Sequence, residues 1–414
     1  MPMQAPAVAS VNQALPTVRW GMIALVFSAT AINYLDRQTL SVVAPLLRDQ
    51  FGMSNVAYSR VVFAFMLAFT VMNGVSGPLL DRIGVRAGYA LCMAWWSAAA
   101  VLHAFARNAW HLGVCRFLLG MAEAGNWPAG VKVVTEWFPD RERATASGIF
   151  NSGAAVAAIA APPLVVWIVR SLGWPAAFAI VGASGFLWIL FWWPNYYTPA
   201  EPRGAPPPSG VPLGKLLRNR FVWSFTLSKV FIDPVWYFYA FWFPEYLKRV
   251  RQFDLASIGK YAWIPFLAAA LGNLLGGWTA AFLLRCGLSL SVARKTAVTF
   301  FVVMMASGIP AVLVGNAGVS IAWVSLALAG YTGSAANMMA FPADVFPKNL
   351  VGSVYGLASM GSGFGGMLFS LITGWVIDHY SYVPVFMGFG ITPLIGVLIL
   401  WTWLGPLRPT SEFA

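Results

Sequence analysis

Charged residues are scarce in this chain of 414 residues. Only 10% are Asp, Glu, Lys or Arg, whereas 59% are hydrophobic; a soluble domain has roughly a quarter charged residues. A water-soluble fold of this composition would expose large apolar areas, but a membrane protein would not, because lipid covers its outer surface. The mean hydropathy of +0.70 agrees. The composition therefore indicates an integral membrane protein.

Cysteine is also nearly absent, which argues against a disulfide-stabilised protein and against a cysteine metal site. Cys92, Cys115 and Cys286 lie in or beside apolar stretches and are too few and too scattered for a disulfide framework or a metal site. The sequence has no GxxxxGK[ST] loop, so ATP is not expected to drive the protein. The sequence offers no nucleophile–base pair on which an enzymatic activity could rest, so no enzyme is expected. No cofactor is expected either. The net charge of +12 does not indicate nucleic-acid binding, because the basic residues lie between apolar segments.

Long apolar runs, by contrast, are abundant. A helix needs about 20 apolar residues to cross the hydrocarbon core of a bilayer. The first 18 residues carry no positive charge, and the apolar stretch from Trp20 is too long and continues too directly into other spans to be cleaved, so it predicts a first transmembrane helix rather than a signal peptide. Twelve spans are predicted in all: 20–46, 57–80, 87–106, 110–136, 144–169, 174–193, 221–246, 258–284, 293–314, 320–341, 352–376 and 383–404.

A proline-rich polar stretch at 196–220 separates the sixth and seventh spans. Such a segment cannot bury a core and is typical of a linker. The predicted fold is an all-α membrane protein with two six-helix bundles, at 1–195 and 221–414, around a central cavity. This is a common transporter architecture.

Lysine and arginine indicate the orientation. If both termini and the linker face the cytoplasm, most of the 26 basic residues fall on the cytoplasmic side, as the positive-inside rule requires. Lys248, Arg249 and Arg251 run against this bias on a predicted outer loop. We expect them to be solvated there; the alternative is a weak attraction for anions.

The second loop carries a glycine- and charge-rich motif, Gly77-Pro-Leu-Leu-Asp81-Arg82-Ile-Gly84-Val-Arg86. We expect its charged residues to have a structural or gating role. Solvation of the loop and the positive-inside orientation signal would explain them equally. The motif resembles the signature loop of the major facilitator superfamily, with a degenerate counterpart at 277–285 followed by Arg294 and Lys295. The resemblance covers nearly the whole chain and implies alternating access between two bundles.

Ionisable residues inside the spans are few. They are costly in a membrane and usually face a cavity. They are Asp36 and Arg37 in the first span, Arg116 and Glu123 in the fourth, Lys229 and Asp233 in the seventh, and Asp344 at the end of the tenth.

Arg116 and Glu123 are seven residues apart, so they share one helix face about 10 Å apart. Burial would favour the protonated form of Glu123, while a nearby arginine would favour the charged form. For Asp36, Arg37, Arg116 and Glu123 the alternative is a structural ion-pair network. Lys229 and Asp233 are four apart and could pair with each other, with a role as a gate, a substrate contact or a structural pair left open; Asp344 is expected to be structural.

The residues around these charges carry a second resemblance. The stretch 33–42, with Asn33-Tyr34-Leu35-Asp36-Arg37, and the stretch 116–139 resemble the anion:cation symporter family within that superfamily. The resemblance implies that Asp36 and Glu123, with Arg116, act in proton coupling and that Arg37 binds a substrate carboxylate. The stretch 229–247 is similar to bacterial hexuronate transporters, but Phe69 stands where sugar-acid relatives often have tyrosine.

A sugar acid also needs hydrogen-bonding and aromatic partners. The candidate substrate contacts are Tyr34, Asn73, Asn151, Trp236, Tyr237, Asn273 and Asn337. Helix–helix hydrogen bonding is an equal alternative for each amide.

The sequence therefore predicts a proton-coupled importer of a hexuronate in a bacterial inner membrane, with both termini cytoplasmic. Its partners would be a small organic anion, protons and the lipid bilayer, with no nucleic acid, and we expect a monomer. Another organic anion, such as an aldonate or aldarate, is the alternative substrate. A proton-coupled drug exporter and a sugar-acid sensor without flux are less favoured.

Overall fold

A computed structural model describes residues 16–197 and 213–408, and within these ranges every regular element is a helix. The first half contains α1 (Pro16–Phe51), α2 (Asn55–Ile83), α3 (Val85–Leu102), the 3-10 helix η2 (His103–Phe105), α4 (Ala109–Glu123), α5 (Asn126–Trp137), α6 (Asp140–Leu172) and α7 (Trp174–Asn195). The second half contains α8 (Leu213–Leu216), α9 (Arg220–Ile232), α10 (Pro234–Arg249), α11 (Leu255–Tyr261), α12 (Ile264–Arg285), α13 (Leu290–Met305), α14 (Gly308–Leu313), α15 (Ala317–Met338), α16 (Phe341–Val345), α17 (Lys348–His379) and α18 (Tyr382–Thr402).

The twelve predicted spans are all found as helices. Among the described residues, 10 helical segments are long and apolar enough to cross a membrane. The two remaining spans, predicted at 110–136 and 221–246, each consist of two shorter helices: α4 with α5, and α9 with α10. The all-α membrane fold predicted from the sequence is therefore confirmed.

Local sequence explains both breaks. Pro234 is the first residue of α10, and because proline has no amide hydrogen it cannot continue the hydrogen-bond ladder of α9. The break between α4 and α5 falls at Gly125, whose amide bonds back only three residues, to the carbonyl of Ala122 at 3.1 Å. A Cβ atom at Gly125 would lie 2.5 Å from the sulfur of Cys92, so glycine permits this close approach of α3.

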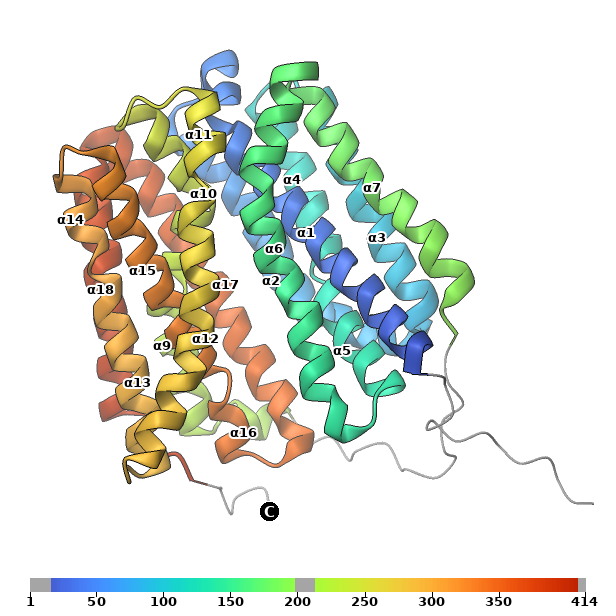
Figure 1. The fold of residues 1–414 in the computed structure, drawn as a ribbon, viewed down its shortest axis with the longest axis vertical. Coiled ribbons are helices and arrows are strands. Elements are labelled where there is room, and N and C mark those ends of the chain that lie inside the picture. Colours follow the sequence, from blue (N-terminus) through green and yellow to red (C-terminus); the bar gives the residue numbers. More distant parts are fainter. Residues whose placement is uncertain (1–15, 198–212, 409–414) are drawn as a thin grey trace, which may run out of the picture.

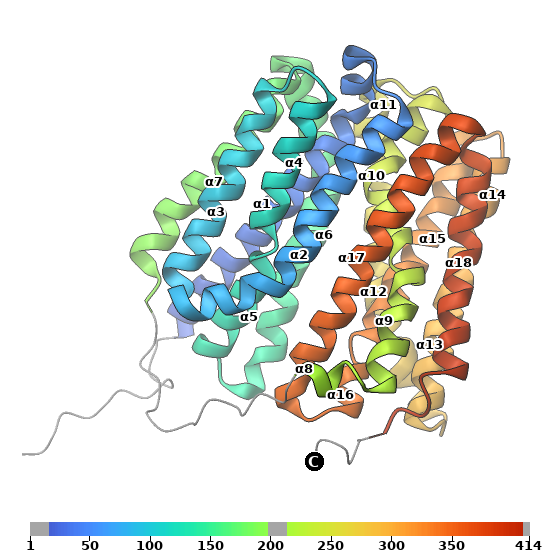
Figure 2. The same ribbon diagram turned by 180° about the vertical axis from the view of Figure 1, so that it is seen from behind.

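The helices form two groups in space. Figures 1 and 2 show α1 to α7 on one side and α9 to α18 on the other. Small residues allow close packing within a group: a Cβ atom at Gly272 on α12 would lie 2.6 Å from the Cα atom of Ala329 on α15. Since dispersion and backbone proximity hold helices together in lipid, such small-residue contacts stabilise the packing.

The molecule has two distinct ends. We call the near end the one where α1 begins and α18 ends, and the far end the one where α1 ends and α11 lies (Figure 1). The two helix breaks lie between these ends, part way along the fourth and seventh spans. Most of the predicted linker, 198–212, lies outside the described residues.

Candidate functional site

A buried ion pair joins α1 to α4 at the break in the fourth span. The Nε and Nη2 atoms of Arg37 donate to Oε2 of Glu123 at 3.1 and 2.8 Å. Only 7% of the Arg37 side chain and none of the Glu123 side chain is exposed. Oε1 of Glu123 has no hydrogen-bond partner among the described residues, so this carboxylate can accept a further bond or a proton.

Three aromatic rings surround the Arg37 guanidinium. Its central carbon lies 5.0 Å from the ring centroids of Tyr34 and Phe65 and 4.7 Å from that of Phe69. Arginine stacks well on aromatic faces because its planar charge is delocalised and weakly hydrated. Phe69 therefore contacts the predicted anion-binding group directly, but it offers no hydroxyl.

Arg116 and Asp36 extend this buried cluster. Arg116 is 1% exposed and its Nη2 lies 3.4 Å from the carbonyl oxygen of Arg37. Its Nε and Nη1, and Oδ2 of Asp36, have no hydrogen-bond partner in the described part of the chain. Since unpaired buried polar groups are costly, these atoms are suited to bind water, a proton or a ligand. The structure thus brings all four predicted charges of the first and fourth spans together.

The broken seventh span supplies aromatic side chains on the second-half side of the buried charges. On α10, Tyr237 stacks near Phe241, and its hydroxyl lies 3.4 Å from that of Ser362 on α17. Trp236 stacks on Tyr331 of α15 with centroids 5.6 Å apart. Tyr237 is near enough to Arg37 to interact electrostatically with it. Tyr34 and Tyr237 therefore lie where the two groups of helices meet, whereas the rings in contact with Trp236, Phe266 and Tyr331, belong to its own group.

The Lys229–Asp233 pair forms as the spacing predicts. The Lys229 Nζ lies 2.7 Å from Oδ2 of Asp233, and both side chains are buried. The ammonium also lies 5.6 Å from the ring centroid of Tyr355 on α17. Asp233 follows the last residue of α9, so the pair sits directly at the helix break.

The four candidate amides have different surroundings. Asn337 donates to the carbonyl oxygens of Gly276 at 2.8 Å and Gly333 at 3.0 Å, which joins α15 to α12. Oδ1 of Asn151 is buried without a hydrogen-bond partner among the described residues. Asn73 is half-buried and Asn273 exposed. The helix–helix alternative therefore accounts for the Asn337 amide nitrogen, while the other three amides remain candidates for ligand binding.

The glycine- and charge-rich loop lies at the near end. Gly84 has a φ of +82° between α2 and α3, a conformation that glycine adopts without strain. Asp81 pairs with Lys132 of α5, and Arg86 donates to the carbonyl of Trp193 at 3.1 and 2.7 Å. The exposed Arg82 and the half-buried Gly77 lie in the last two turns of α2.

The counterpart in the second half is also tied down by an ion pair. Arg294 on α13 pairs with Asp344 of α16 at 3.1 Å, so the expectation of a structural role for Asp344 agrees with its position.

Hydrogen bonds between the two groups of helices close the far end. The hydroxyl of Ser41 on α1 donates to the carbonyl of Ala240 on α10 at 2.6 Å. This carbonyl is free because Pro244, four residues later, has no amide hydrogen to bond it. The hydroxyl of Tyr58 donates to the next carbonyl, of Phe241, at 2.8 Å.

Ion pairs reinforce this closure. Glu245 of α10 is fully buried and pairs with both Arg48 of α1 and Arg249 of α10, and Arg249 pairs in turn with Asp49. Arg251 donates to the carbonyls of Ala311 and Val314. Arg249 is exposed, as expected of a solvated residue, but it lies at the end of α10 and pairs with two acids. Arg251 is half-buried against the carbonyls that it binds, so it is less solvated than expected. We call the contacts between the two groups, Ser41 with Ala240, Tyr58 with Phe241, Arg48 with Glu245 and Arg249 with Asp49, the closure contacts.

Sequence reasoning missed several residues near the site. Asn33 is fully buried, and neither atom of its amide group has a hydrogen-bond partner among the described residues. Phe65, Tyr331 and Tyr355 supply rings around the charges. Asn33 carries a signal in the sequence, since it lies four residues before Arg37 and hence on the same face of α1. The three rings carry none, because aromatics are common throughout the spans.

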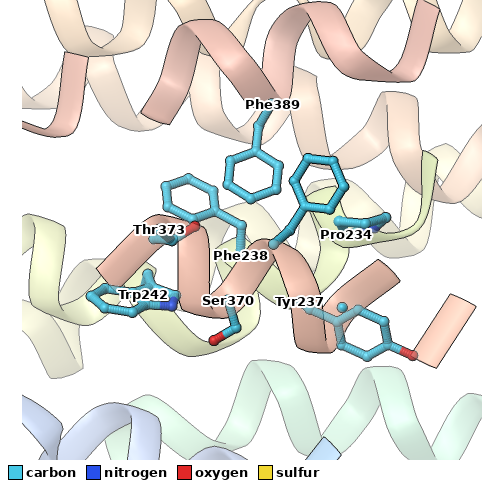
Figure 3. Close-up of a pocket in the computed structure, with 9 residues that line it drawn as sticks. Pro234, Tyr237, Phe238, Trp242, Ser370, Thr373 and Phe389 are labelled. Atoms are coloured by element: carbon cyan, nitrogen blue, oxygen red, sulfur yellow. The ribbon is translucent and has the colours of Figure 1, made fainter. Parts of the chain in front are cut away.

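A small cavity adjoins the site on the side of α10. Its volume is about 10 Å³, room for about one water molecule. Figure 3 shows Trp242 and Ser370 near it, with Tyr237 at another side. The Trp242 indole nitrogen and the Ser370 hydroxyl have no hydrogen-bond partner among the described residues, so a water molecule would satisfy them. A sugar acid needs hundreds of Å³, and this cavity therefore does not hold one.

Twelve spans in two groups, with buried charges at broken helices where the groups meet, are typical of a membrane transporter. The sequence matches the profile of the Major Facilitator Superfamily over residues 26–330 and 264–413. The chain belongs to this superfamily; it is a multi-pass membrane transporter and not an enzyme.

Individual relatives support this assignment. The chain is 34% identical to the hexuronate transporter of Escherichia coli K12, over 96% of each chain. It is 28% identical to the D-galactonate transporter of Escherichia coli O6:H1, over 96% of this chain and 98% of the relative. A crystal structure of a D-xylose-proton symporter superposes with a TM-score of 0.77 at 13% identity, covering 94% of this chain and 98% of that one, which shows the shared fold.

Proposed function

We propose that this protein is a proton-coupled symporter that imports a hexuronate, glucuronate or galacturonate, across a bacterial inner membrane. The observation that carries the proposal is the buried Arg37–Glu123 pair, in which a protein carboxylate occupies the arginine that a substrate carboxylate would need. The similarity to a hexuronate transporter, higher than that to a galactonate transporter, favours the hexuronate.

The coupling follows from competition for Arg37. Protonation of Glu123 would remove its charge and weaken both hydrogen bonds from Arg37. The guanidinium would then be free to bind a substrate carboxylate within its ring of Tyr34, Phe65 and Phe69. Proton and anion would therefore enter together, and neither would leave the site readily alone.

Asp36 and Arg116 would form a second proton site. Asp36 interacts electrostatically with both Arg116 and Glu123, so a proton on one carboxyl group favours ionisation of the other. One proton with one monoanion is electroneutral and gains 1.36 kcal/mol per pH unit. A second proton would add roughly 2.3 kcal/mol per 100 mV.

The aromatic groups fit the ring of a hexuronate. Sugar C–H faces pack on flat aromatic surfaces, and the stacked Trp236 and Tyr331 offer such a surface beside Tyr237. Asn73, Asn151 and Asn273 would bind hydroxyl groups. An open-chain aldonate or aldarate would use Arg37 but would profit less from the rings.

Transport would proceed by alternating access. The two bundles, 1–195 and 221–414 joined by 196–220, would rock about the site. With both termini in the cytoplasm, the closure contacts lie on the outer side, and import would require them to break and re-form in each cycle. The Asp81–Lys132 and Lys229–Asp233 pairs would contribute to gating.

The test is uptake of labelled glucuronate and galacturonate into proteoliposomes with and without an inward proton gradient. The variants are Glu123→Gln and a matched control, Asp254→Asn, which changes an exposed carboxylate far from the site. We expect gradient-driven accumulation by the wild type and the control, and counterflow exchange without accumulation by Glu123→Gln.

The other outcomes separate the parts of the proposal. No uptake of either acid by folded protein would exclude the hexuronate and leave an aldonate or aldarate to be tried. Equal accumulation with and without the proton gradient would exclude proton coupling. Outward movement of lipophilic cations that does not depend on Arg37 would indicate a drug exporter, and binding without flux would indicate a sensor.

A further inference from the structure

A crevice of about 480 Å³ lies between α6 and α11 at the far end. Its lining includes Val166, Trp167, Arg170 and Ser171 from α6 and Gly259 and Lys260 from α11. Figure 1 shows α11 beside the upper part of α6. The crevice is therefore built from both groups of helices and is separate from the buried charges around Arg37.

Close packing fixes the floor of this crevice. A Cβ atom at Gly259 would lie 2.8 Å from the Cβ atom of Val166, so the two helices touch at this glycine. The walls on either side cannot approach further. The space is thus a permanent feature of this arrangement of α6 and α11.

Two exposed cations, Arg170 and Lys260, stand at the crevice. Neither forms an ion pair with a described residue within 4.0 Å. The acidic side chain that interacts with Arg170 is Asp254, whose carboxylate already accepts a hydrogen bond from the amide of Ser257 at 2.9 Å. Two cations and one nearby carboxylate leave a net charge of about +1, which matches a single phosphodiester.

The crevice lies at the depth of lipid head groups. Arg170 is in the last turn of α6, at the end of the apolar span Thr145–Leu172. Trp167, one turn deeper, is 65% exposed on a helix that faces lipid, as in the aromatic belts of membrane proteins. The apolar surface thus complements the acyl chains of a phospholipid, and the cations complement its phosphate group.

We propose that this crevice binds an anionic phospholipid. Its phosphate group would lie between Arg170 and Lys260, near the Ser171 hydroxyl, and an acyl chain would run along Trp167. A free phosphate would use the cations but would leave the apolar wall exposed. Because the two cations come from different groups of helices, the bound lipid would stabilise the state in which α6 and α11 are in contact.

The experiment is native mass spectrometry of the full chain in detergent, titrated with phosphatidylglycerol or with phosphatidylcholine of the same acyl chains. The test variant is Arg170→Gln/Lys260→Gln. The matched control is Arg107→Gln/Lys248→Gln, which removes the same charge from the same end of the molecule. We expect wild type and control to bind phosphatidylglycerol more tightly, and the test variant to bind it roughly thirtyfold more weakly.

The contrary outcomes are distinct. Equal affinity of the wild type for the two lipids, or unchanged binding by the test variant, would overturn the proposal. Displacement of phosphatidylglycerol by millimolar inorganic phosphate would assign the cations to a soluble anion and would also overturn it. Thermal unfolding of both double variants near that of the wild type will show that the substitutions leave the fold intact.

Discussion

Replacement of Glu245 by glutamine should open the far end of the molecule more than replacement of Arg48 does. Glu245 is fully buried and accepts from two arginines, Arg48 across the interface and Arg249 on its own helix. In Glu245→Gln, the buried Arg48 loses its charged partner and keeps two weak bonds to the Met53 carbonyl at 3.3 Å and at most a neutral bond to the glutamine carbonyl. In Arg48→Gln, Glu245 still has Arg249.

The magnitude follows from burial. Removing one member of a buried ion pair costs about 3–5 kcal/mol, because the other charge is left without compensation. This cost applies to the closed arrangement alone, since water reaches Arg48 once the far end separates. At the lower figure the ratio of closed to open molecules falls roughly 100-fold. For Arg48→Gln we expect about 1.5–3 kcal/mol, the value of one hydrogen bond to a charged group.

The assay is distance measurement by electron paramagnetic resonance. Spin labels at Arg107→Cys and Val319→Cys, both exposed at the far end of opposite groups, are placed in a chain without its native cysteines. We expect long distances to gain population in the order wild type, Arg48→Gln, Glu245→Gln. An order in which Arg48→Gln exceeds Glu245→Gln, or no change in either, would refute the reasoning from the closure contacts.

Three further predictions use the same structure. Ser41→Ala should leave the Ala240 carbonyl unpaired and cost the closed far end about 1–3 kcal/mol, seen as more long distances in the same assay, whereas Ser28→Ala, whose hydroxyl bonds its own helix, should not. Arg37→Lys should abolish most uptake, because lysine is a compact, strongly hydrated charge that cannot bind the substrate carboxylate with two donors as a guanidinium can; normal uptake would argue against Arg37 as the anion site. Gly272→Val should lower the thermal unfolding temperature by overlap with α15, while Gly277→Ala, which has open space around it, should leave it unchanged.

Much of the fold was predictable because a long apolar run in a membrane protein has one structural explanation. Apolar runs of about 20 residues must be helices that cross the bilayer, and all twelve were located from the sequence. The helix breaks were harder to place. Pro234 marks one of them, but Gly125 is one glycine among 39, and its role depends on the approach of Cys92 from another helix.

The site was predictable to the extent that charge is rare in the membrane. Asp36, Arg37, Arg116 and Glu123 were singled out as buried charges, and the structure brings them together. Which of them pair was not predictable, because pairing depends on how α1 and α4 face each other. The role of Glu245 was missed for the opposite reason: it lies near the end of a span, where a charge is ordinary, and its burial comes from the partner bundle.

The two spans that fall short as simple transmembrane helices are also the two that hold buried ion pairs at their breaks. The reason is physical. A segment that places ionisable side chains at mid-depth loses hydropathy, and a break lets the chain redirect those side chains. Glu123 ends α4, and Asp233 follows the end of α9. Helix breaks at equivalent places in the two halves therefore coincide with buried ion pairs, although α1 carries Asp36 and Arg37 without a break; a break together with a buried charge, rather than a break alone, marks the transport site.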